Sequence, residues 1–209
     1  HDGREKFVQL AMADTDRRVG EDKPVAPSFM LACLLWHEVL DRWQQLKKRG
    51  EPAFPALQQA IDSVFDARIG DISGRGKLAA DMREIWMMQP RFERRVGSAP
   101  YTLIEQPRFR AGFDFLRLRG DVGEIDVELA NWWEDFSLGD DDERIALMEL
   151  AREQSHAKRG PAAAGAASGP SEGEGAEPAK KRRRRRRKPQ AAADAGSPAD
   201  SESSDSGSQ

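Results

Sequence analysis

The spacing of apolar residues constrains the fold of this chain more than any other feature of its sequence. Before residue 155 these residues recur at helical rather than alternating intervals, and Pro and Gly punctuate the segments. The longest such segment has one apolar stripe: Leu31, Leu35, Val39 and Trp43. Side chains four residues apart share a helical face, so the stripe predicts a buried helix. The pattern predicts an all-α fold, with a compact multi-helix domain over residues 1–157.

Breaks in the pattern divide this domain into segments. Helices are predicted from about Glu5 to Val19, from Pro27 to Arg49, from Pro55 to a C-terminal cap at Gly70, from Leu78 to a stop or kink at Pro90, from Pro107 onward, from Gly123 to Phe136 and from Asp141 to Gln154. Trp36 and Trp43 lie on the apolar stripe, which favours a place in the core over base stacking. Asp140, Asp141 and Asp142 precede a helix start, where carboxylates favour capping over metal binding.

Charge is distributed very unevenly behind a formal net charge of -3. The segment 68–119 has eleven basic and six acidic residues, whereas 121–153 has two basic and twelve acidic residues. Residues 158–209 form a predicted disordered, low-complexity basic tail of Ala, Gly, Ser, Pro and charged residues. The acidic zone is a candidate for holding this tail when no other polyanion is bound.

One run in the tail consists only of cations: Lys180, Lys181, Arg182, Arg183, Arg184, Arg185, Arg186, Arg187 and Lys188. Like charges keep such a run extended, and guanidinium forks suit phosphate oxygens. A nucleic-acid backbone is therefore the predicted partner, and a solvated run without a ligand is the alternative.

The predicted body offers a second set of basic and aromatic residues that suit a nucleic acid. Arg75 and Lys77 stand at a predicted helix start, where phosphate is favoured. Phe92 and Tyr101 are predicted to lie in a connection between helices, where an aromatic ring could meet an unstacked base. The remaining candidates are arginines: Arg91, Arg94, Arg95, Arg108, Arg110, Arg117 and Arg119.

Other features of the sequence narrow the classes of protein to which this chain can belong. Cys33 is the only cysteine, so no internal disulfide forms and a reduced cytoplasm is the expected compartment. The most apolar run, residues 29–36, is too short to cross a membrane. The three scattered histidines suggest no metal or nucleophile constellation, and no catalytic residue or metal ligand is assigned. The chain begins at His1 rather than Met, which suggests a fragment or a processed product.

Several ordered segments together carry a family resemblance. They are Thr15-Asp16-Arg17-Arg18, Lys23-Pro24-Val25, Pro27-Ser28-Phe29, Glu84-Ile85-Trp86, the stretch from Gln106 to Asp114, and Trp132-Trp133. In order and spacing this set resembles bacterial poly(A) polymerase over nearly all of residues 3–137, and an arginine-rich carboxyl terminus is also typical of that family. The resemblance implies the RNA-binding helical part of an enzyme that adds AMP from ATP to RNA 3' ends.

In that family, ATP and magnesium are used by an amino-terminal nucleotidyltransferase domain with paired aspartates after a glycine turn. This sequence contains no such constellation, so we expect no cofactor in this chain and no activity from it alone. The expected partner is single-stranded RNA, held near its 3' end without regard to sequence; protein partners are not indicated. Two alternatives stay open: a stand-alone helical RNA-binding or protein-interaction scaffold, and a complete small enzyme.

Overall fold

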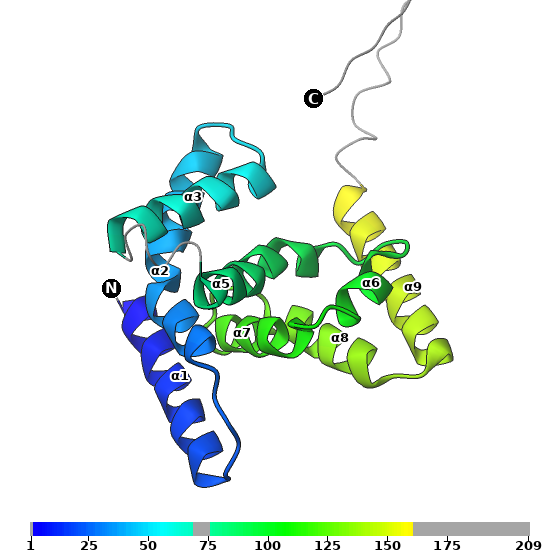
Figure 1. Ribbon diagram of the computed structural model, residues 1–209. Helices are drawn as coiled ribbons and strands as arrows, with labels where there is room; N and C mark the ends of the chain where they lie inside the picture. Colours follow the sequence, from blue (N-terminus) through cyan, green and yellow to red (C-terminus); the bar gives the residue numbers. More distant parts are fainter. Residues whose placement is uncertain (1, 69–75, 161–209) are drawn as a thin grey trace, which may run out of the picture. The chain divides into compact units, whose positions relative to one another are not determined.

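The structure, a computed structural model, describes residues 2–68 and 76–160. Within these ranges the chain is helical and contains no strand (Figure 1). The elements are α1 (Asp2–Gly20), α2 (Pro27–Lys48), α3 (Ala53–Arg68), α5 (Lys77–Met88), the 3-10 helix η1 (Gln89–Glu93), α6 (Ala99–Ile104), α7 (Phe109–Asp121), α8 (Val127–Leu138) and α9 (Asp141–Arg159). The all-α prediction is confirmed.

Two short elements, η1 and α6, were not predicted. Pro90 does not release the chain into a loop, because a proline is tolerated in the first turn of a new helix, and η1 follows α5 directly. Helix α9 ends five residues beyond the predicted Gln154, and its last turn contains His156, Lys158 and Arg159, whose charges suit that end of a helix. The predicted cap at Gly70 lies outside the described residues.

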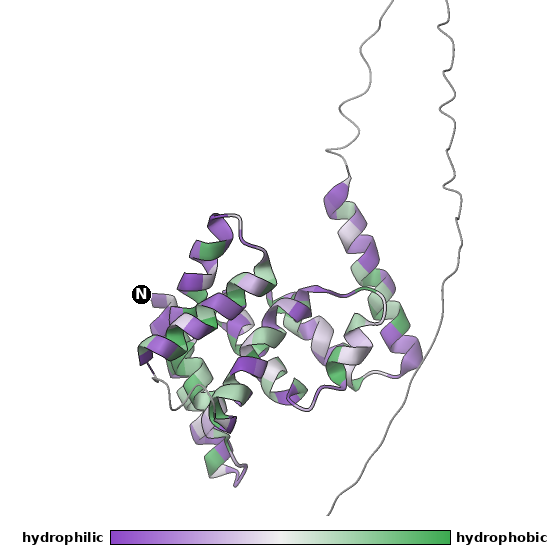
Figure 2. Cartoon of the chain, turned by 45° about the horizontal axis from the view of Figure 1, so that its top comes forward, coloured by the Kyte–Doolittle hydropathy of each residue, from purple (hydrophilic) through white to green (hydrophobic). Residues whose placement is uncertain are grey.

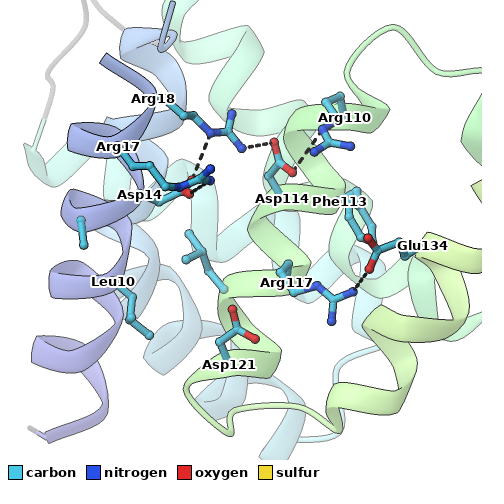
Figure 3. A pocket seen from close by; sticks show the side chains of 12 residues that line it. Leu10, Asp14, Arg17, Arg18, Arg110, Phe113, Asp114, Arg117, Asp121 and Glu134 are labelled. Carbon is cyan, nitrogen blue, oxygen red and sulfur yellow. Dashed lines mark hydrogen bonds and ion pairs between the residues drawn. The ribbon is translucent and has the colours of Figure 1, made fainter. Parts of the chain in front are cut away.

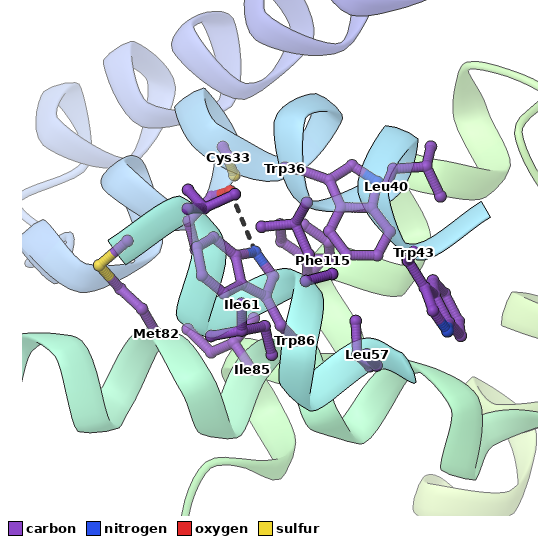
Figure 4. Packing of buried hydrophobic residues seen from close by; sticks show 14 of the residues in the cluster. Cys33, Trp36, Leu40, Trp43, Leu57, Ile61, Met82, Ile85, Trp86 and Phe115 are labelled. Atoms are coloured by element: carbon purple, nitrogen blue, oxygen red, sulfur yellow. Dashed lines mark hydrogen bonds between the residues drawn. The ribbon is translucent and has the colours of Figure 1, made fainter. Parts of the chain in front are cut away.

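The first of two apolar clusters lies among α2, α3 and α5. The fully buried side chains of this cluster include Trp36, Ile61 and Trp86 (Figure 4). Phe115 of α7 enters the same cluster and meets the Trp36 ring edge-on, with 5.2 Å between centroids. Helix α7 is thereby anchored to the amino-terminal helices.

The second cluster joins the opposite face of α7 to η1, α8 and α9. Phe92, Trp133 and Phe136 are fully buried in it. Helix α7 therefore has apolar residues on two faces, whereas α8 and α9 each turn an apolar face to this cluster, and most helices in Figure 2 show a mixture of hydrophilic and hydrophobic positions. Most of α9 remains exposed, and Ala151 is its only buried residue.

All five tryptophans lie in these clusters, and each indole N–H is satisfied. Trp43 donates to the Ala53 carbonyl at 2.9 Å, Trp86 to the Ala32 carbonyl at 3.2 Å, and Trp133 to the Phe92 carbonyl at 2.7 Å. A buried indole needs such an acceptor, so these residues fix the packing of the helices. The predicted core positions of Trp36 and Trp43 are confirmed.

Gly112 marks a close approach between α7 and the end of α5. A Cβ atom at this position would overlap the Sδ atom of Met88, which is itself buried. Gly112→Ala is therefore expected to lower the free energy of unfolding by about 1–3 kcal/mol, because Met88 must move within a packed core. Urea unfolding measures this loss. Gly3→Ala, where the added Cβ meets nothing within 4 Å, should cause none; equal stability of the two variants would contradict the prediction.

Asp140, the first residue of the acidic triplet, caps α9, and Asp141 and Asp142 lie in the first turn of that helix. The Asp140 side chain accepts from the Glu143 backbone N–H at 2.9 Å, and the Glu143 side chain accepts from the Asp140 N–H at 2.9 Å. This reciprocal pair is a capping box, so the capping role predicted for this triplet is confirmed at Asp140. None of the described helices is both long enough and apolar enough to span a bilayer.

Candidate nucleic-acid interface

The predicted arginines of α7 and its N-cap are all engaged by neighbouring side chains. Arg108 contacts Asp81 at 2.7 Å, and Arg110 contacts Asp114 at 3.3 Å. Arg117 donates to the Asn131 Oδ1 atom at 2.7 Å and also pairs with Glu134. These partners partly neutralise the guanidinium groups, so α7 offers less positive charge than its sequence suggests.

Arg119 is the most deeply buried arginine of this group. Its side chain is 8% exposed and pairs with Glu124, while its guanidinium group stands 5.0 Å from the centre of the Trp36 ring. Gln89 accepts a further bond from Arg119 at 3.2 Å. The prediction that Arg119 contacts RNA therefore needs correction, because its charge is used inside the fold.

A groove between α1 and α7 contains further arginines that were not predicted as binding residues. Arg18 of α1 reaches Asp114 of α7 at 2.8 Å, and Arg17 contacts Asp14 at 2.6 Å (Figure 3). The hydrogen bond that Arg18 donates to the Asp114 carboxylate raises the pKa of Arg18 above its usual value. The only sign of their position was the Thr15-to-Arg18 motif, which gives no distance to α7.

Charge in this groove is balanced. Its cavity of about 430 Å³ is lined by the four arginines Arg17, Arg18, Arg110 and Arg117 and by the four carboxylates Asp14, Asp114, Asp121 and Glu134. Such a surface exerts little long-range attraction on a polyanion. The groove therefore fits a role in holding α1 against α7 better than a role in capturing RNA.

The arginines that follow α5 differ from those of α7 in the partners of their side chains. Among the residues that the structure describes, no hydrogen bond or ion pair engages the side chains of Arg91, Arg94 or Arg95, although each guanidinium group carries five donors. Arg94 is exposed, and Arg91 is half-buried. Arg95 stands 5.4 Å from the centre of the Trp132 ring, and burial lowers its pKa from the usual value. Lys77, at the start of α5, is exposed.

The two aromatic candidates, Phe92 and Tyr101, differ in how accessible their rings are. Phe92 is 0% exposed and packs edge-on against Trp133 at 5.2 Å, so the expectation of an accessible ring in a connection is wrong for this residue. Tyr101 belongs to α6 and is half-buried. Its ring meets Phe136 edge-on at 5.3 Å and lines a hollow beside α9.

Helix α9 adds Arg152, which sequence reasoning missed. Ile145, Met148, Glu149 and Arg152 line the same hollow as Arg95 and Tyr101. Their spacing of three and four residues places them on one face of α9, and this spacing was visible in the sequence. We call the group of Arg94, Arg95, Tyr101 and Arg152 the η1–α9 surface.

Some predicted residues cannot be placed. Arg75 and the run from Lys180 to Lys188 lie outside the described residues. Within residues 2–68 and 76–160, no group of three or more His, Cys, Asp or Glu side chains is arranged to hold a metal ion. The described part of the site is thus a set of arginines and one tyrosine on a helical scaffold.

Comparison with known proteins identifies the family. Residues 49–189 match the family described as polymerase A arginine-rich C-terminus. Poly(A) polymerase I of Haemophilus influenzae is 31% identical over 147 residues, which are 69% of this chain and 32% of that protein. The chain belongs to the bacterial poly(A) polymerase family. Poly(A) polymerase I of Escherichia coli O157:H7 is 31% identical over 160 residues, or 74% of this chain and 34% of that protein.

The extent of the family match confirms the resemblance found in the sequence. The matched region begins at the end of α2 and includes the helices α3 to α9 as well as the run from Lys180 to Lys188. The η1–α9 surface therefore lies entirely within the matched region. The chain spans about a third of the length of the curated relatives it matches.

Proposed function

We propose that this chain is the RNA-holding part of a poly(A) polymerase that adds AMP from ATP to RNA 3' ends. The chain spans a third of relatives named poly(A) polymerase I, so catalysis with ATP and magnesium belongs to a longer protein in this proposal. A cytoplasmic location accords with this role. The expected partner is single-stranded RNA of any sequence.

One observation carries the proposal beyond family membership. Arg94 and Arg95 have no hydrogen-bond or ion-pair partner in the described part of the chain, whereas the arginines of α7 are already paired. A guanidinium group without a carboxylate partner can give its full charge to a phosphate. The η1–α9 surface thus supplies fixed phosphate contacts, and the run from Lys180 to Lys188 supplies further cations.

The basic run and the η1–α9 surface have different roles in this proposal, and both act through phosphate contacts, which position a strand without reading its bases. The basic run raises the local concentration of RNA, and Arg94 and Arg95 fix the path of the strand over the helical body. Sequence preference is not expected from either set. Binding should weaken as salt rises, because each contact releases condensed counterions.

Replacing Arg94 and Arg95 with glutamine tests the fixed contacts. We expect weaker binding of unrelated single-stranded RNAs to a similar degree, and a shallower salt dependence by about 0.7 in logarithmic slope for each lost contact. Fluorescence anisotropy at several salt concentrations measures both quantities.

The matched control replaces Lys48 and Arg49, two exposed cations at the end of α2, with glutamine. It removes the same formal charge from a different place. Equal effects of the two double variants would show that only net charge matters and would contradict fixed contacts on the η1–α9 surface. Absence of RNA binding by the intact chain in dilute buffer would overturn the proposed function itself.

A further inference from the structure

The hollow beside α9 has a composition that simple phosphate binding does not require. Its volume is about 370 Å³, and its walls combine apolar side chains with two arginines. The connection between η1 and α6 contributes Arg95, Val96 and Gly97, α6 contributes Tyr101, and α9 contributes the other four residues. Phosphate alone would need only the cations, so the apolar wall calls for a different group of the ligand.

The apolar side chains of the hollow are accessible to a ligand. Val96 is 53% exposed and Ile145 is 52% exposed, so a ligand in the hollow can reach both side chains. Tyr101 is held in place by its contact with Phe136, so its ring is presented by a fixed scaffold. A rigid aromatic ring beside aliphatic side chains is the usual platform for an unstacked nucleobase.

The charged side chains select an anionic ligand over an apolar peptide. Among the described residues, neither Arg95 nor Arg152 has an ion-pair partner, and Glu149 pairs with neither of them. One carboxylate beside two guanidinium groups leaves the wall with a net positive charge. A nucleotide has both an apolar ring face and a phosphate, so it matches both halves of the hollow.

We propose that this hollow is a nucleobase subsite of single-stranded RNA, in which a base packs against Tyr101 and Val96 while its flanking phosphates contact Arg95 and Arg152. The inference rests on the proposed RNA-holding function and adds a contact with the base to it. Every base has a ring face, so the subsite distinguishes RNA with bases from a bare sugar-phosphate chain but reads no sequence.

Two oligomers of equal length and charge isolate this contact. One is oligouridylate, whose bases stack weakly on one another, and the other is the same ribose-phosphate chain without bases. The full chain is titrated with each oligomer by fluorescence anisotropy. Contacts to phosphate are the same for both, so their affinity ratio reports the base. We expect oligouridylate to bind about 5- to 100-fold more tightly.

Variants locate the effect in the hollow. Tyr101→Ala and Val96→Glu should each bring the affinity ratio close to one, and Tyr101→Phe should preserve it. Val96 is exposed, so Val96→Glu keeps the test valid even if Tyr101→Ala disturbs the packing on Phe136. Arg49→Gln is the control for lost charge at a distant exposed site and should leave the ratio unchanged.

The outcomes separate the two proposals. If neither oligomer binds the intact chain, the proposed function fails. If both bind equally tightly, RNA holding stands, the base subsite is overturned, and the hollow is left to an apolar segment of another protein. If the ratio survives in both Val96→Glu and Tyr101→Ala, bases are bound elsewhere and the inference is also overturned.

Discussion

Replacing Arg182 to Arg187 with glutamine is expected to reduce the affinity of the chain for single-stranded RNA by about 100- to 10,000-fold at 0.1 M salt. These six residues lie in the unbroken cationic run of nine. Each phosphate contact on a single strand contributes about -0.7 to the logarithmic salt slope, so the loss of six contacts makes the slope shallower by about 4. Anisotropy titrations between 50 and 300 mM salt measure the affinity and the slope together.

The matched control changes the same six arginines to lysine. Lysine keeps the charge but lacks the planar fork, so most of the salt slope should remain while affinity falls only modestly. A loss confined to one RNA sequence, or an unchanged slope in the glutamine variant, would show that the run does not act as a counterion-releasing tether.

The prediction for the run and the prediction for the η1–α9 surface are separable. The six-residue change should lower the affinity for oligouridylate and for the baseless chain by the same factor, because both have the same phosphates. A change at Tyr101 should lower only the affinity for oligouridylate. Together the variants assign charge to the run and contact with the base to the hollow.

Helical periodicity was enough to predict the fold. The apolar face that contains Trp43 could be predicted without knowing the partner helices, because the spacing of apolar residues alone places them on one face. The capping role of Asp140 was also predictable, since the residues of a capping box lie within one turn. Such features depend on neighbours in the sequence, which a single chain displays directly.

The candidate site was harder to predict because it depends on distant partners. The sequence places Arg95 and Arg119 in the same basic zone with nothing to distinguish them. Only the folded chain shows that Arg119 meets Glu124 and Trp36, whereas Arg95 has no carboxylate partner among the described residues. Phe92 was misplaced for a related reason: Pro90 signalled a break, but the chain continued as a 3-10 helix that turns the ring into the core.

The buried network around Arg119 joins three parts of the body. Glu124 accepts from Arg119 and from the Trp36 indole N–H, the latter at 2.9 Å. Gln89 accepts from Arg119 at 3.2 Å and donates to the Gly112 carbonyl at 3.2 Å. Arg119 of α7 is thereby linked to α2 through Glu124 and Trp36, and to the start of η1 through Gln89. Glu124 is the carboxylate that balances the buried charge of Arg119.

Glu124→Ala is accordingly expected to destabilise the fold by about 3–5 kcal/mol, because Arg119 is then left as a buried cation without its counterion. Urea unfolding followed by tryptophan fluorescence measures the loss. Glu134→Ala removes the partner of Arg117 at a carboxylate that is 50% exposed, and it should cost less than about 1 kcal/mol. Replacing Arg119 with Met and Glu124 with Leu together should recover only part of the loss: no unpaired charge remains, but the buried Trp36 indole N–H still lacks its acceptor. Equal costs for Glu124→Ala and Glu134→Ala would mean that the Arg119 pair is no more important to stability than a surface contact.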